Sequence, residues 1–139
     1  MSPVEELNGD LSFNESNLHE KIAGVPGIVT KWADRFIKAK RRLATLETER
    51  SRLIKGRTNY YAGRKKNPDT DKFCPATLSP QEIRDTYIPG DDVVIEVTLR
   101  VATQKSQVLF FEHAVKQANA FQWTIKNYIE WQKYTQGAM

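Results

Sequence analysis

The chain has 139 residues, of which 27% are charged and 40% apolar, ordinary values for a single globular domain over 1–139. Its one cysteine, Cys74, cannot form an intrachain disulfide, so the cysteine content does not point to secretion. The first residues lack a signal-peptide pattern, and no apolar run approaches the roughly 20 residues of a membrane span. We therefore expect a protein that stays in the compartment where it is made, with no membrane partner.

Residues 1–25 are predicted to form a polar, acidic N-terminal segment. Leu11 and Phe13 favour a short strand there, and a capping pattern indicates a short helix over 18–23. Gly and Pro residues within 24–27 are expected to break the chain. The sequence leaves open whether this segment binds a partner or folds back on the basic helix that follows.

Residues 26–63 are predicted to form one long basic helix. Pro26 suits a first helical turn, and Gly63 is a natural C-terminal stop. Gly56 weakens the helix by about 1 kcal/mol relative to Ala. Apolar residues recur in alternating steps of three and four, which is heptad spacing. They are Val29, Trp32, Phe36, Ala39, Leu43, Leu46, Leu53 and Tyr60.

Positive charge is concentrated in residues 31–66. Thirteen Lys and Arg stand there against three acidic residues, a net +10, whereas the whole chain carries only +4. A field of this kind attracts polyanions. A solvated helix face is the plainer alternative, but such faces normally mix charges in i,i+4 pairs. The cations are Lys31, Arg35, Lys38, Lys40, Arg41, Arg42, Arg50, Arg52, Lys55, Arg57, Arg64, Lys65 and Lys66.

Residues 64–90 are predicted to be a loop that contains a short helix. Its first residues are charged and turn-prone. Ser79-Pro80-Gln81-Glu82 combines a Ser cap with Pro at the first position and Glu at the third, which is typical of a helix start. That helix should end before Pro89.

Residues 91–136 are predicted to form a long C-terminal helix capped by Asp91 or Asp92. Residues 93–99 alone favour a strand, and a strand followed by a shorter helix is the main alternative. A heptad pattern nevertheless continues through them without interruption by Pro or Gly. The fold class is therefore all-α, with two long antiparallel helices, a short helical insert and a small N-terminal segment.

This C-terminal helix carries apolar residues on more than one face. Phe121, Ile125 and Tyr128 lie on one side, and Trp123, Trp131 and Tyr134 lie on another. A helical hairpin has too little mass to cover both, so we expect neighbouring subunits to supply the cover. Packing against the N-terminal segment of the same chain is the alternative.

The sequence contains no constellation typical of catalysis. The two His residues lie far apart in sequence from each other and from Cys74, and there is no set of ligands with metal-site spacing. A Gly-rich phosphate loop ending in Gly-Lys-Ser/Thr is missing from the sequence as well. We expect a protein that is not an enzyme and uses no metal or other cofactor.

Basic and aromatic residues interleave over 55–66, a combination that suits single-stranded nucleic acid. Cations neutralise phosphates, and aromatic rings stack on unpaired bases with about 1–3 kcal/mol per base. Helical spacing places Arg57, Tyr61 and Arg64 on one face, whereas Tyr60 could instead belong to the core. The predicted DNA-binding residues are Arg41, Arg42, Lys55, Arg57, Tyr61, Arg64, Lys65 and Lys66.

The motif Tyr60-Tyr61-Ala62-Gly63-Arg64, after a Lys-x-Arg pair, resembles the central motif of the UvsY family of T-even-like phages. The tail over 123–134, with Gly137, is similar to that family's closing helix, and Lys31-Trp32 also fits. The resemblance covers nearly the whole chain. Gly56 departs from the Ala that usually separates the family's basic pair.

The resemblance implies a recombination mediator in the host cell cytoplasm that hydrolyses no nucleotide. It implies a homo-oligomeric ring, a hexamer or heptamer, that binds single-stranded DNA. Such a ring helps to load a RecA-like phage recombinase onto strands covered by the phage single-strand-binding protein. It assigns DNA contact to Lys55 and Arg57, and oligomerisation to Phe121, Ile125, Ile129 and Trp131.

Two other functions remain open from the residues alone. A coiled-coil adaptor or scaffold could use its basic helix to bind an acidic protein. An architectural or regulatory protein could bind duplex DNA. An adaptor would not bind DNA at physiological salt, and a duplex binder would prefer duplex over single strands.

Overall fold

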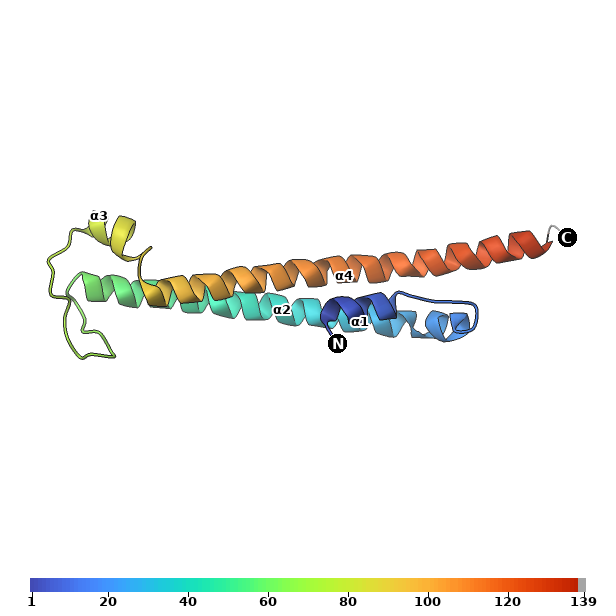
Figure 1. The fold of residues 1–139 in the computed structure, drawn as a ribbon, viewed down its shortest axis with the longest axis horizontal. Helices are drawn as coiled ribbons and strands as arrows, with labels where there is room; N and C mark the ends of the chain where they lie inside the picture. Colours follow the sequence, from blue (N-terminus) through green and yellow to red (C-terminus); the bar gives the residue numbers. More distant parts are fainter. Residues whose placement is uncertain (138–139) are drawn as a thin grey trace. The chain divides into compact units, whose positions relative to one another are not determined.

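The computed structural model describes residues 1–137, and these residues contain helices and no strand (Figure 1). Two long helices dominate, as the heptad patterns predicted, and the short insert lies between them in the chain. The elements are α1 (Pro3–Asp10), α2 (Leu18–Tyr61), α3 (Pro80–Glu82), the π-helical turn η1 (Ile83–Tyr87) and α4 (Asp92–Gly137). The all-α prediction is confirmed.

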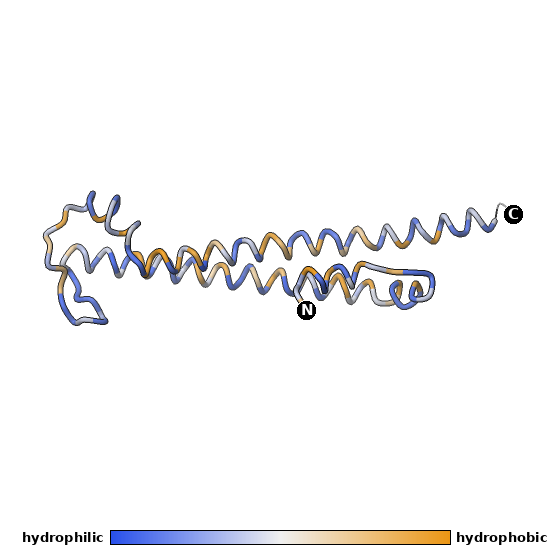
Figure 2. The backbone as a smooth tube through the Cα atoms, viewed as in Figure 1, coloured by the Kyte–Doolittle hydropathy of each residue, from blue (hydrophilic) through white to orange (hydrophobic). Residues whose placement is uncertain are grey.

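The chain forms two compact units, each built from a part of α2 and a part of α4. Unit 1 comprises Met1–Ala39 and Gln107–Met139, and unit 2 comprises Lys40–Ser106. The two helices run antiparallel within each unit, because contacts made earlier in α2 fall later in α4. Hydrophobic and hydrophilic positions alternate along both helices, as amphipathic packing requires (Figure 2).

Helix α1 begins with a capping box. The Ser2 hydroxyl accepts a hydrogen bond from the Glu5 amide at 3.2 Å, and the Glu5 carboxylate accepts one from the Ser2 amide at 3.4 Å. Pro3 occupies the first helical position. The strand predicted near Leu11 is wrong, because the Leu11 amide closes α1 by donating to the Leu7 carbonyl at 3.0 Å, and Phe13 packs against Phe121 and Tyr128 of α4.

The acidic N-terminal segment folds back on the start of α2 within unit 1. The two terminal nitrogens of the Arg35 guanidinium donate to the Glu6 carboxylate, at 2.7 and 2.9 Å, and Lys31 donates to it at 3.1 Å. The hydrogen bonds from Arg35 and Lys31 lower the pKa of Glu6 to about 2. Of the two alternatives that the sequence left open, the segment therefore shows the one in which it folds back on the basic helix.

The break predicted over 24–27 is wrong, because α2 begins at Leu18 and continues through Pro26. Pro and Gly inside a helix cost about 3 and 1 kcal/mol respectively, so packing must offset the loss. Val25 is buried in a cluster with Leu18, Phe121 and Ile125, and this burial favours helix over a break. The hydroxyl of Thr30 donates to the Pro26 carbonyl at 2.9 Å.

The core of unit 1 is built around Trp32, whose side chain is fully buried. Its ring centroid lies 6.2 Å from that of Phe110 and 6.1 Å from that of Phe111. The small side chains of Ala114 and Ala118 leave room for the indole on α4. The indole Nε1 donates to Asp10 at 2.9 Å, so its one polar atom is satisfied.

In unit 2, the buried residues of α4 follow the heptad pattern. Val94, Val97, Val101 and Gln104 are all buried, at i, i+3, i+7 and i+10, which only a helix places on one face. The strand alternative for residues 93–99 is therefore excluded. Tertiary packing outweighs the β-propensity of the local Val and Ile residues.

We expect Trp32→Ala to lower the free energy of unfolding by about 3–5 kcal/mol, since it removes the largest buried side chain and leaves a cavity. Chemical denaturation followed by circular dichroism measures the loss. Leu109→Ala is the control for an exposed apolar side chain: Leu109 is 65% exposed, so its replacement should change stability by about 0.5 kcal/mol or less. Equal losses in the two variants would contradict this description of the core.

Candidate nucleic-acid interface

A row of exposed polar residues runs along α2 in unit 2, and we call it the basic stripe. Its members are separated by alternating steps of four and three, so they share one side of the helix. From first to last the stripe extends about 21 Å at the rise of an α-helix. It consists of Arg41, Thr45, Thr48, Arg52 and Lys55.

The three cations of the stripe have no ion-pair partner among residues 1–137. Unit 2 carries fourteen Lys and Arg against nine Asp and Glu, a net +5, whereas unit 1 carries seven against eight. Of the acidic residues near the stripe, Glu49 pairs with Arg100 on α4 at 3.7 Å. The positive field predicted from the sequence is therefore concentrated in unit 2.

A buried carboxylate holds the end of α2 to the start of α4. Asp91 is only 4% exposed, and its Oδ2 accepts from Arg57 Nε at 2.7 Å and from the Tyr61 hydroxyl at 2.6 Å. Its Oδ1 accepts from the amides of Val93 and Val94, at 2.9 and 3.2 Å, and so caps α4. We call Asp91, Arg57 and Tyr61 the Asp91 cluster.

The electrostatics of the Asp91 cluster favour an ionised carboxylate. Burial opposes ionisation of Asp91, but hydrogen bonds from Tyr61, Arg57 and Val94 outweigh it, so the pKa of Asp91 lies below its ordinary value. For Tyr61, burial and the hydrogen bond to Asp91 raise the pKa of the hydroxyl, which therefore stays protonated and donates.

Aromatic rings surround the Arg57 guanidinium. Its Cζ lies 4.6 Å from the ring centroid of Tyr60 and 5.2 Å from that of Tyr61. Tyr87, from η1, stands 5.4 Å from Tyr61 between centroids. Tyr60 and Tyr61 are both half-buried. Tyr60 is therefore neither a core residue nor a fully exposed one. Cation–π contact and the ion pair together fix the orientation of Arg57.

A family model described as "Recombination, repair and ssDNA binding protein UvsY" matches residues 6–138. The chain belongs to the UvsY family. The resemblance to this family found in the sequence is thereby confirmed, and the match extends over nearly the full length of the chain. The family is one of recombination, repair and single-stranded-DNA-binding proteins.

Individual relatives agree with this placement. "Recombination protein uvsY" of Enterobacteria phage T4 is 26% identical over 93 residues, which is 67% of this chain and 65% of that protein, a little under two thirds of its length. Two crystal structures of the bacteriophage T4 recombination mediator protein UvsY, in lattice types II and IV, match with TM-scores of 0.80 and 0.79. They are 21% and 22% identical to this chain, cover 97% and 94% of it, and are themselves covered over 98% and 94%. These structures show a shared fold.

The basic pair that the UvsY resemblance assigned to DNA contact has two different environments. Lys55 is exposed on the basic stripe, whereas Arg57 belongs to the Asp91 cluster, with 18% of its side chain exposed. The helix continues through Gly56, where an added Cβ would meet nothing within 4 Å. An alanine would thus fit at this position.

Of the other predicted DNA-binding residues of this UvsY-family chain, Tyr61 is half-buried in the Asp91 cluster, and the remaining five are exposed. Arg41 and Arg42 lie on α2 in unit 2, and 64–66 follow the end of that helix. Gly63, at φ +75°, ends α2 in the left-handed conformation that favours glycine, and the Arg64 amide donates back to the Asn59 carbonyl at 2.9 Å. Lys66 Nζ lies 5.6 Å from the ring centroid of Phe73.

Sequence reasoning did not single out Arg52 or the partner of Arg57. The spacing of Arg52 between Arg41 and Lys55 was a usable signal, because it repeats the heptad steps. Asp91 was identified only as one of two candidate caps. Its ion pair joins positions 34 residues apart in sequence, and no local pattern carries that information.

The predicted oligomerisation residues are divided between the core and the surface of unit 1. Phe121 and Ile125 are buried against Leu18 and Val25, whereas Trp131 is 62% exposed and Ile129 is half-buried. Phe121 and Ile125 therefore follow the alternative prediction, in which the C-terminal helix packs against the N-terminal segment of the same chain.

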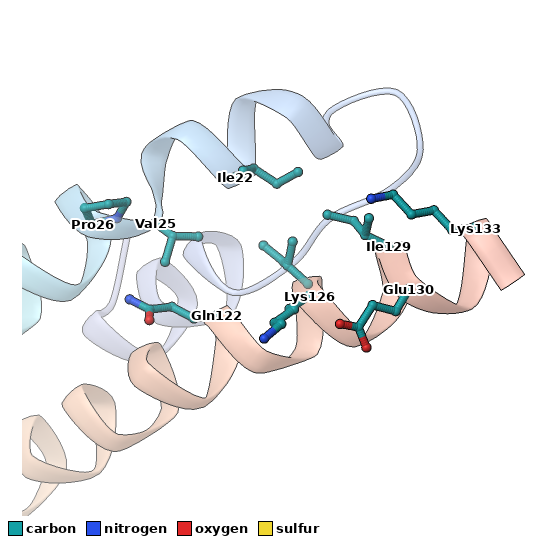
Figure 3. Close-up of a pocket in the computed structure, with 9 residues that line it drawn as sticks. Ile22, Val25, Pro26, Gln122, Lys126, Ile129, Glu130 and Lys133 are labelled. Atoms are coloured by element: carbon teal, nitrogen blue, oxygen red, sulfur yellow. The ribbon is translucent and has the colours of Figure 1, made fainter.

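A groove of about 500 Å³ lies in unit 1 between α2 and the last part of α4 (Figure 3). Ile22 and Val25 line it from α2, and Ile129 lines it from α4. Lys126 and Lys133 supply charged side chains at the same groove. Its apolar lining would be covered if another surface packed there.

Within residues 1–137 no group of three His, Cys, Asp or Glu is placed to hold a metal ion. Among the described helices, none combines the length and apolarity that crossing a bilayer requires.

We expect Asp91→Asn to destabilise unit 2 by about 3 kcal/mol at neutral pH, because it leaves Arg57 without its buried counter-charge while keeping a capping oxygen. Asp92→Asn, at the neighbouring exposed position, is the control. The folded pKa of Asp91 is lowered, so its contribution is complete above its ordinary value of 3.8 and is lost as pH falls through the folded value. The stability gap between wild type and Asp91→Asn, from urea unfolding, should therefore shrink below about pH 4. A gap that is constant from pH 7 to pH 2 would refute the assignment.

Proposed function

We propose that this chain is a recombination mediator that binds single-stranded DNA as a homo-oligomer. In this role it promotes loading of a RecA-like phage recombinase onto strands covered by the phage single-strand-binding protein, in the host cytoplasm. Membership of the UvsY family supports the DNA-binding part of the proposal. The observation that carries it is the exposed basic stripe, whose cations have no ion-pair partner among residues 1–137.

The basic stripe suits a flexible polyphosphate. Arg52 and Lys55 are three residues apart and point to the same side of α2, where they reach successive points along a strand. Contacts to phosphate do not depend on base sequence, so binding is expected to be similar for unrelated sequences. The residues 64–66, immediately after α2, extend the positive surface beyond the helix.

Self-association would multiply this contact. Trp123, Trp131 and Tyr134 on α4 are 63%, 62% and 77% exposed, an amount of aromatic surface that favours burial by another subunit. Linked copies raise the effective concentration of each further DNA contact, so weak binding per subunit becomes firm binding by the assembly. A strand held at several points can be presented to a recombinase while a competing single-strand-binding protein is released.

We expect Arg52→Ala with Lys55→Ala to weaken binding to single-stranded oligonucleotides uniformly across sequences, without loss of folding, since both side chains are exposed. Each lost phosphate contact should flatten the slope of log affinity against log salt concentration by about 0.7. Fluorescence anisotropy at several salt concentrations measures both quantities.

Lys105→Ala with Lys116→Ala is the charge-matched control for this experiment, because both lysines are exposed on α4. The control should retain more of the wild-type slope. An unchanged slope in the stripe variant would rule the stripe out as the DNA site. Preference for duplex, or binding only to an acidic protein, would favour the architectural or the adaptor function instead.

For assembly, we expect Trp131→Ala to shift sedimenting protein toward smaller species at low concentration, because the exposed indole would be buried between subunits. Analytical ultracentrifugation measures the distribution. Leu109→Ala is a matched control, since Leu109 is 65% exposed on the same helix and outside the predicted interface residues. If Trp131→Ala sediments like wild type, the interface lies elsewhere.

A further inference from the structure

Unit 2 contains a cavity of about 300 Å³ between the last turns of α2 and the α3–η1 insert. Its lining is largely apolar, and Ile83 in it is only 4% exposed. A pocket of this size is at the small end of those that hold ligands, and suits one flat ring system rather than a larger molecule. The apolar side chains are Ile54, Ala62, Pro80, Ile83 and Ile88.

Two arginines also line this cavity, one from each side. Arg84, on η1, is 74% exposed, and its contact with Asp85 at 3.3 Å joins neighbouring residues of the chain. Arg64, after α2, reaches Asn59 Oδ1 only at 3.5 Å. Both guanidinium groups are therefore weakly held and able to bind an anion. An apolar cavity beside two such cations matches a ligand with an apolar ring next to a phosphate.

The cavity lies on the continuation of the basic stripe. Thr58 and Ala62 line it, and they follow Lys55 at i+3 and i+7, so they lie on the same side of α2. A strand whose phosphates follow the stripe from Arg41 to Lys55 is thereby led to the mouth of the cavity. The Thr58 hydroxyl donates to the Ile54 carbonyl at 2.7 Å, which leaves its oxygen able to accept a hydrogen bond.

We propose that this cavity holds one unstacked base of the bound strand, with the adjoining phosphates on Arg64 and Arg84. This inference rests on the single-stranded DNA binding proposed above and adds a base site to a phosphate track. The apolar walls make contact with any base, and Thr58 offers one acceptor, so the site selects unpaired over paired bases without reading sequence. A base site of this kind discriminates against duplex DNA, in which the bases are already paired and stacked, whereas the stripe alone does not.

The experiment compares a fluorescent thymidine oligonucleotide with an abasic oligonucleotide of the same length and phosphate number. The wild-type oligomer should bind the thymidine strand about fivefold or more tightly, since only that strand places an apolar ring in the cavity. Ala62→Phe fills the cavity from an exposed position at the end of α2. It should lower thymidine-strand affinity to the abasic level and leave the abasic affinity unchanged.

Ala102→Phe, at an exposed position on α4 in unit 2, is the matched control and should keep the preference for bases. Equal wild-type affinity for the two strands would overturn the base site while leaving DNA binding intact. Failure of both strands to bind would instead refute the proposed function. Retention of the base preference in Ala62→Phe would overturn the base site as well. A third result would also overturn the base site: Ala62→Phe leaves DNA binding unchanged but weakens binding of a fluorescent Asp- and Phe-rich peptide. The cavity would then bind a protein partner instead of a base.

Discussion

The carboxylate of Asp91 connects three features of unit 2: the start of α4, the end of α2 and, through Tyr61, the η1 insert. One oxygen caps α4, and the other binds Arg57 and Tyr61 near the end of α2. Tyr61 in turn packs against Tyr87 of η1, so the insert contacts the end of α2 beside this carboxylate. A buried, ionised carboxylate is stable only when its ion-pair and hydrogen-bond partners are in place. The polar contacts of Asp91 therefore fix the geometry of this junction, in addition to apolar packing.

Helix α2 carries cations in two different electrostatic settings. In unit 1, Lys31 and Arg35 are matched by the Glu6 carboxylate of α1, and they serve to attach the N-terminal segment. In unit 2, Arg52 and Lys55 are exposed without ion pairs and remain available to a polyanion. A single amphipathic helix thus has a structural half and a half suited to binding phosphates, and total charge alone would not distinguish them.

Helix type and register were well predicted from the sequence, because the heptad pattern reports burial directly: Val94, Val97 and Val101 are buried as their spacing required. Family membership, too, followed from a short motif and the tail. The continuous helix through Pro26 was missed because its stability comes from contacts with Phe121 and Ile125, far away in sequence. For the same reason, the sequence identified Arg57 as a cation but did not reveal its ion pair with Asp91. Nor did the sequence show which apolar faces of α4 are buried and which are exposed.

Pro26 has a further consequence for how α2 behaves in solution. A proline has no amide proton, so the Ile22 carbonyl lacks its helical hydrogen bond, and the turns that precede Pro26 are joined to the rest of α2 by one bond fewer. Local opening is least costly where such bonds are missing. Amide protons in the first two turns of α2 should therefore exchange with solvent before those around Trp32, even though both stretches belong to one unbroken helix.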